Sequence, residues 1–154
     1  MPAAPAHEPC DDGDRWEYSL HIPYDARAIG VARSTLHAVL ARHGLAGLID
    51  RALLLASELL TNAYLHARGP ASLRLRWQRG VLRLGVWDTD PTPPAPAPAK
   101  AMAAEGGRGL LLVCTCADDW GWFLLGDDVF GARGKYVWCD LATKPEHDAW
   151  SVAA

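Results

Sequence analysis

The chain has 154 residues, which suits one compact domain able to bury about two-thirds of its unfolded surface. Its 15 basic and 18 acidic residues leave a net charge of −3 and form no basic run, which argues against direct binding of nucleic acid. No apolar stretch reaches membrane-spanning length and no charged segment precedes an apolar signal core, so we expect a cytoplasmic protein without a membrane contact.

Composition divides the chain into three parts. Residues 1–14 are rich in Pro, Ala and Asp and are expected to form a loose tail. Residues 15–142 carry the regular apolar patterns of one domain, and residues 143–154 are expected to form a C-terminal tail. The four cysteines lack the Cys-x-x-Cys spacing of zinc sites, so we interpret them as reduced structural thiols.

The first half of the domain predicts one strand and two helices. Apolar and polar residues alternate over residues 16–22, as in a half-buried strand. Asp25 can cap a helix that ends near His43. A second helix is expected over residues 47–67, and Gly69-Pro70 would end it.

A hairpin follows, in which Arg79-Gly80 is expected to form the turn. Successive side chains of a strand point to opposite faces, so one face of the returning strand collects four inward residues. These are Leu82, Leu84, Val86 and Asp88. Asp88 therefore ends an apolar face, close to whatever helices cover the sheet.

The rest of the domain predicts a loop, a helix and two further strands. Residues 89–99 are rich in Pro and Ala and cannot join a sheet. An apolar helix is expected over residues 110–117, and strands over 120–125 and 135–141. This order predicts an α/β (α+β) two-layer sandwich, with a mixed, mainly antiparallel sheet covered on one face by about three helices.

Three polar residues follow one face of the second helix, which is otherwise almost wholly apolar. Glu58, Asn62 and His66 are spaced four residues apart, so they share a helix face. The apolar surroundings predict that this helix is buried. A buried polar line needs water, a metal or a ligand beside it, because an unpaired buried polar group costs about 1–3 kcal/mol. His66 alone also fits an ordinary histidine at a helix end.

A glycine-rich segment, Gly106-Gly107-Arg108-Gly109, precedes the third expected helix. Glycines let the backbone approach a bound group closely, and a helix N-terminus presents free N–H groups to anions. Arg108 would add a charge-assisted contact to a phosphate. Taken alone, the segment also fits a flexible loop, and it matches neither a P-loop nor the dinucleotide fingerprint.

Two other features have plain alternatives. Asp88 begins Asp-Thr-Asp-Pro, which is good turn chemistry. The segment 89–105 would serve as a linker, but it lies between two candidate site elements, where long loops often act as lids.

The combination of these motifs resembles the histidine-kinase-like ATPase superfamily. Within it, the chain resembles the anti-sigma-factor serine kinases of bacterial partner switching and related small ATP-binding regulators of actinobacteria. The segment from Glu58 to His66 is similar to the family's N-box, Gly107-Arg108-Gly109-Leu110 to its second glycine box, and Gly134-Lys135-Tyr-Val-Trp138 to its final strand. The resemblance covers about residues 16–142 and implies a Bergerat-type ATP-binding fold.

The resemblance implies a role for each matched residue. Asn62 would hold a Mg²⁺ ion that bridges the ATP phosphates, and Glu58 would act as a base or position the acceptor hydroxyl. Asp88 would accept a hydrogen bond from the adenine amino group, and His66 would lie beside the nucleotide. The backbone amides expected to wrap the phosphates are those of Gly106, Gly107, Arg108, Gly109 and Leu110. The family's adenine box reads Asp-x-Gly-x-Gly, whereas Asp88-Thr-Asp-Pro-Thr92 has neither glycine.

The resemblance implies a regulator that binds ATP and Mg²⁺ and phosphorylates a serine or threonine of an anti-sigma-factor antagonist. Its partners would be that antagonist, a sigma factor or both, and relatives often form homodimers. A non-catalytic module that uses the nucleotide to shape a protein-binding surface is the second hypothesis. A sensor histidine kinase fragment fits less well, because no dimerisation helix carries a phosphoacceptor histidine. A purely structural sandwich leaves the polar line unexplained.

Overall fold

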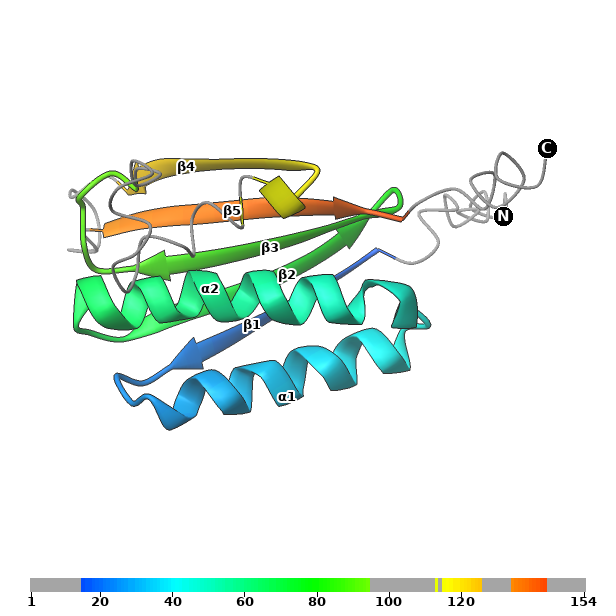
Figure 1. The fold of residues 1–154 in the computed structure, drawn as a ribbon, viewed down its shortest axis with the longest axis horizontal. Coiled ribbons are helices and arrows are strands. Elements are labelled where there is room, and N and C mark those ends of the chain that lie inside the picture. The colour runs from blue at the N-terminus through cyan, green and yellow to red at the C-terminus, as the bar shows by residue number, and fades with distance from the viewer. Residues whose placement is uncertain (1–14, 95–112, 114, 126–133, 144–154) are drawn as a thin grey trace, which may run out of the picture.

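Five strands form the sheet that the alternating apolar pattern predicts (Figure 1). The computed structural model describes residues 15–94, 113, 115–125 and 134–143. The strands are β1 (Trp16–Ile22), β2 (Ala71–Gln78), β3 (Val81–Asp88), β4 (Asp119–Leu125) and β5 (Gly134–Ala142). They pair in the order β1-β2-β3-β5-β4, and every pairing among these described strands is antiparallel, so this sheet is not mixed.

Two long helices, joined by a 3-10 turn, lie in the second layer. They are α1 (Arg27–Arg42) and α2 (Ile49–Ala67), with η1 (Ala46–Leu48) between them. The N-cap residue of α1 is Ala26, which makes no side-chain cap hydrogen bond, so the prediction of Asp25 as the cap is wrong by one residue. The Asp25 Oδ1 atom still accepts a hydrogen bond from the Arg27 backbone N–H at 2.9 Å. The third expected helix, over residues 110–117, lies mostly outside the described residues, although Val113, Thr115 and Cys116 are helical.

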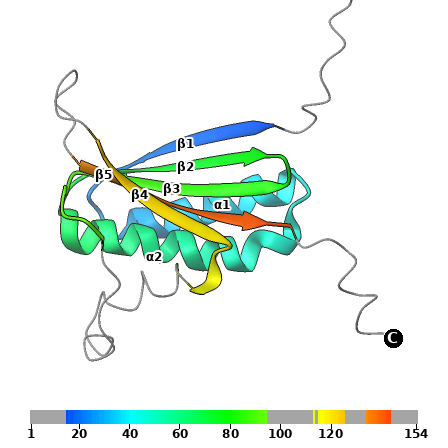
Figure 2. The same cartoon turned by 90° about the horizontal axis from the view of Figure 1, so that it is seen from above.

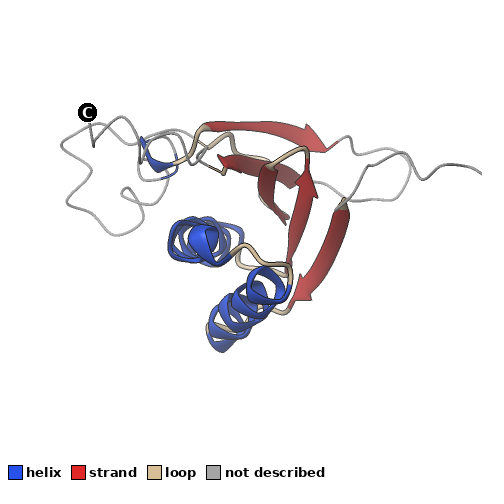
Figure 3. Ribbon diagram, turned by 90° about the vertical axis from the view of Figure 1, so that its right-hand side faces the viewer, coloured by secondary structure: helices blue, strands red, loops and turns tan. Residues whose placement is uncertain are grey.

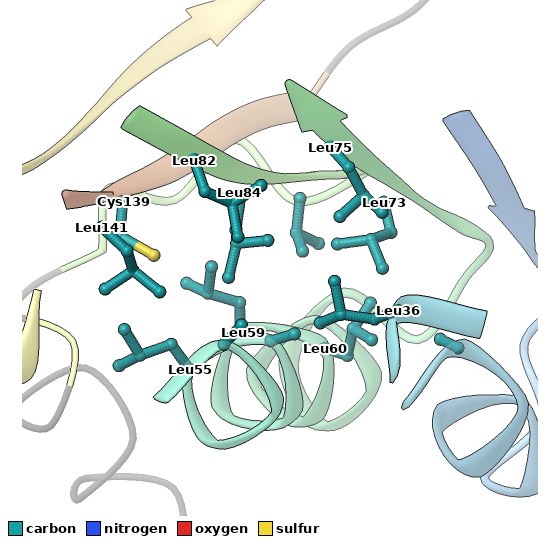
Figure 4. Close-up of a cluster of buried hydrophobic side chains, with 14 of the residues drawn as sticks. Leu36, Leu55, Leu59, Leu60, Leu73, Leu75, Leu82, Leu84, Cys139 and Leu141 are labelled. Carbon is teal, nitrogen blue, oxygen red and sulfur yellow. The ribbon is translucent and has the colours of Figure 1, made fainter. Parts of the chain in front are cut away.

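The helices cover one face of the sheet, and the core fills the space between the two layers (Figures 2 and 3). Figure 4 shows leucines of β2 and β3 pointing toward α2 and toward Leu36 of α1. Cys139 lies in this core without solvent exposure, and burial raises the pKa of its thiol to about 12. That thiol is therefore protonated near neutral pH, which agrees with a structural role. Among the described helices, none has both the length and the hydropathy needed to span a bilayer.

The β2–β3 hairpin confirms the predicted turn and the predicted faces. Arg79 and Gly80 both have positive φ angles, 52° and 75°, as a two-residue type I′ hairpin requires. This turn fixes the register, so β3 directs its even-numbered residues toward the helices. The inward residues Leu82, Leu84, Val86 and Asp88 are all buried, with exposed fractions of 4 % or less.

The opposite face of the sheet carries a second set of contacts, without helix cover from the described residues. Arg83 of β3 forms two hydrogen bonds with the Asp140 carboxylate of β5, at 2.7 and 2.9 Å. The Arg83 guanidinium also lies 3.9 Å from the ring centroid of Trp138. Tyr136 extends over Gly85, where any Cβ would collide with the phenol ring. These side chains cross-link the neighbouring strands β3 and β5.

Candidate functional site

A cavity of about 290 Å³ opens where the C-terminal half of α2 meets the end of β3 and the start of β5. Figure 1 shows these three chain segments at the same end of the molecule, on the left of the view. The cavity is lined by Leu59, Asn62, His66, Val86, Asp88, Asp90, Thr92, Pro93, Pro94, Lys135 and Val137. The sequence assigned Asn62, His66 and Asp88 to one site, and the fold brings these three together.

The chemistry of the lining suits a flat heteroaromatic ring. Leu59, Val86 and Val137 supply apolar walls, and six polar or charged side chains share the lining with them. Small-molecule pockets usually combine apolar walls with a small number of placed polar groups that fix orientation. This cavity has that composition.

Asp88 is the most deeply buried acid of the described cavity wall, with an exposed fraction of 4 %. Its Oδ1 atom accepts the Asp90 backbone N–H at 2.9 Å and a Lys135 Nζ proton at 3.1 Å. Both contacts use the same oxygen, so within the described part of the chain Oδ2 is left without a hydrogen bond. Burial raises the pKa of Asp88, and the bonds from Asp90 and Lys135 oppose that rise. A ligand donor is the natural partner for Oδ2.

Lys135 is a site residue to which the sequence interpretation gave no role. Its side chain is 9 % exposed, and besides Asp88 its Nζ donates to the Asp90 carbonyl oxygen at 3.0 Å. The Asp90 carboxylate lies 3.8 Å from the same nitrogen. The signal was available, because period-two counting along β5 places Lys135 on the inward face with Val137 and Cys139. An inward lysine requires a carboxylate, and Asp88 lies directly opposite in the register.

Side chains shape the turn after β3, where the family's pattern has glycines. Asp88 Oδ1 accepts the N–H of Asp90, and Asp90 Oδ1 accepts the N–H of Thr92 at 3.0 Å. These are two successive Asx turns, which hold a backbone bend without glycine. A glycine lies instead at the start of the neighbouring strand β5, against the backbone of Asp88. Gly134 has φ +151°, and a Cβ there would collide with the Asp88 carbonyl oxygen.

The polar line of α2 is less enclosed than predicted. Glu58 and Asn62 are half-buried, and His66 is exposed. Leu54 and Leu65 of the same helix are also exposed, at 41 % and 40 %, so the prediction of a buried helix is wrong for this side of α2 in the described chain. The helix packs against the sheet and α1, and the described residues leave its remaining face uncovered. Glu58 lies one turn before Asn62 and does not line the cavity.

The predicted phosphate-binding residues, Gly106, Gly107, Arg108, Gly109 and Leu110, lie outside the described residues. Their role stays a prediction, as does that of the proposed lid beyond Pro94. The described residues contain no cluster of three or more His, Cys, Asp or Glu side chains able to hold a metal ion. A metal ion here would therefore depend on oxygen atoms of a bound small molecule in addition to Asn62.

Comparison with protein families identifies the chain. The model of the histidine kinase-like ATPase domain matches residues 22–123, well over half of the sequence, so the chain belongs to that family. This match supports ATP binding and includes Asn62, Asp88 and the glycine-rich segment. It ends before β5, so the assignment of Lys135 rests on the structure alone. A comparison with curated proteins found no match.

Proposed function

We propose that this protein is an ATP- and Mg²⁺-binding regulator of the anti-sigma-factor kinase type. In this proposal it phosphorylates a serine or threonine of an antagonist protein, and its partners are that antagonist, a sigma factor or both. A homodimer is part of the same proposal. The observation that supports it best is the cavity in which Asn62 of α2 and Asp88 of β3 face one apolar space.

The cavity can divide ATP recognition between Asp88 and Asn62. Adenine presents an amino group on the edge of a flat ring, and the Oδ2 atom of the buried residue Asp88 offers an acceptor beside apolar walls. Asn62 lies on α2, within the matched family region that also holds the glycine-rich segment. The base would contact Val86 and Val137, while the phosphates extend toward Asn62.

Mg²⁺ fits this donor set because the ion keeps several waters and is commonly bound by few protein ligands together with substrate phosphates. The Asn62 side-chain oxygen would be the protein ligand among the described residues. When bound, the ion would neutralise part of the phosphate charge.

The proposed reaction is a phosphoryl transfer. The partner's hydroxyl oxygen bonds to the γ-phosphorus of ATP while the bond from that phosphorus to the β–γ bridging oxygen breaks, and ADP leaves. The hydroxyl proton passes to the Glu58 carboxylate. Such reactions depend mainly on positioning and charge stabilisation, so a small domain can carry them out.

A second candidate is a non-catalytic module that binds the nucleotide to shape a protein-binding surface. One observation favours it: Glu58 does not line the cavity that holds Asn62 and Asp88. In this alternative the partner binds but is not phosphorylated.

Two measurements test the proposal. Calorimetric titration with ATP, with and without Mg²⁺, should show binding that strengthens with the ion, and GTP should bind more weakly. Transfer of labelled γ-phosphate to a cognate antagonist then separates the two candidates. ATP binding without any transfer to that antagonist supports the non-catalytic module, and absence of ATP binding contradicts both.

A further inference from the structure

We propose that Lys135 is a positioning residue for nucleotide-base recognition, holding one oxygen of Asp88 so that the other faces the 6-amino group of adenine. This inference rests on the proposed function, because it assumes that the cavity binds ATP. It adds to the family's nucleotide-binding pattern a lysine on β5, beyond the matched residues 22–123.

Two hydrogen bonds fix the orientation of the Asp88 carboxylate. A carboxylate at a strand end can rotate, but the Asp88 Oδ1 atom is held from two directions, by the Asp90 N–H at 2.9 Å and by Lys135 Nζ at 3.1 Å. With Oδ1 fixed, the position of Oδ2 follows. A pre-positioned acceptor binds its donor more tightly, because less freedom is lost on binding.

Contacts to the turn that follows Asp88 support the same role for Lys135. Lys135 also donates to the Asp90 carbonyl oxygen at 3.0 Å, so one ammonium group joins the carboxylate and the backbone that follows it. Gly134 allows this approach, because its missing side chain lets β5 lie directly against the Asp88 carbonyl oxygen. Lys135 thus stabilises the segment from which the family's two glycines are absent.

The charge state of Asp88 also depends on Lys135. Burial favours the protonated form of Asp88, whereas recognition of an amine is strongest with the ionised form. The hydrogen bonds from the Asp90 N–H and from Lys135 support ionisation of Asp88, and only the negative charge of the Asp90 carboxylate opposes it. His66 of α2 lines the same cavity. Among these groups, Lys135 is the one in direct ion-pair contact with Asp88.

The test compares two nucleotides and three proteins, with a fourth protein as a control. The nucleotides are ATP and purine riboside triphosphate, in which hydrogen replaces the 6-amino group. The proteins are the unmutated chain, Lys135→Met and Lys135→Arg. Arg83→Met is the matched control, because it removes a cation that is paired with Asp140 at 2.7 Å on the opposite face of the sheet.

We expect Lys135→Met to weaken ATP by about tenfold or more, the scale of one charge-assisted hydrogen bond, and to leave purine riboside triphosphate within about twofold. Lys135→Arg should retain most of the preference for ATP, and Arg83→Met should retain all of it. In a pH series, the loss of ATP affinity on acidification should occur at higher pH in Lys135→Met, because Asp88 protonates sooner.

A purely structural role predicts a different result, namely equal weakening of both nucleotides with an unchanged pH profile, and that result would overturn the inference. If Lys135→Met does not fold, Lys135→Gln keeps a hydrogen-bond donor without the charge and gives the same two readouts. ATP binding that is unaffected by the loss of Lys135 refutes this inference alone. An unmutated protein that does not bind ATP refutes the proposed function as well.

Discussion

Replacing Asp88 with Asn should separate nucleotide recognition from stability. The oxygen of the new amide must take the Oδ1 position, because two donors, the Asp90 N–H and the Lys135 ammonium, already point there. The amide NH₂ then occupies the Oδ2 position and meets the adenine amino group donor to donor. Loss of one hydrogen bond to a charged acceptor corresponds to about 1.5–3 kcal/mol, or about 10- to 100-fold weaker ATP binding.

The same substitution should change the free energy of unfolding by less than about 1 kcal/mol at neutral pH. Burial raises the pKa of Asp88, so the contribution of this carboxyl to stability is fully present below its unfolded pKa and is lost as pH rises through the folded value. At neutral pH an uncharged amide therefore removes little stabilisation. Lys135 also keeps the Asp90 carbonyl oxygen at 3.0 Å and the Asp90 carboxylate at 3.8 Å.

Calorimetry with ATP and purine riboside triphosphate, alongside urea unfolding, measures both effects. Asp140→Asn is the control, because it changes a paired acid on the open face of the sheet and should leave ATP affinity unchanged. Unaltered ATP affinity in folded Asp88→Asn would refute the assignment of Asp88. A fall in stability large enough to account for weaker binding would show that the carboxylate is structural.

The remaining predictions concern the metal, the backbone and catalysis. Asn62→Ala should keep the fold, since this residue is half-buried, and should remove most of the Mg²⁺ dependence of ATP binding; calorimetry showing the same dependence would exclude Asn62 as a ligand. Gly134→Ala should lower the free energy of unfolding by about 1–3 kcal/mol, because its Cβ meets the Asp88 carbonyl oxygen. Gly30→Ala, with open space in α1, should stabilise by about 0.5–1 kcal/mol, and equal effects of the two changes in urea unfolding would contradict the close approach. Glu58→Gln should bind ATP normally and lose about 10²-fold or more in phosphate transfer to the cognate antagonist; transfer at an unchanged rate would remove Glu58 from the reaction.

The fold was largely predictable because its signals are local. The alternation along β1 and the Arg79-Gly80 turn each depend on a few neighbouring residues, and both are found where the sequence placed them. The inward face of β3 followed from counting by twos, which was enough to place Asp88 in the interior layer. The sequence also grouped Asn62 and Asp88, although these two residues lie on different elements.

The missed parts of the site depend on pairing between distant segments. Lys135 meets Asp88 only because β5 pairs with β3, and β3–β5 register cannot be read from either strand alone. The exposure of His66 and Leu65 had a similar cause. Helical periodicity gives the apolar content of α2, but it does not say how many neighbours surround the helix, and the described layers cover only part of it.

The most direct test of the central claim is a crystal structure of the protein with Mg²⁺ and a non-hydrolysable ATP analogue. The account predicts the purine ring between Val86 and Val137, with its 6-amino nitrogen about 3 Å from Asp88 Oδ2, a normal hydrogen-bond distance. Lys135 should still contact Oδ1, and Asn62 should lie beside the metal and phosphates. A nucleotide bound elsewhere, or a base that does not contact Asp88, would contradict the account.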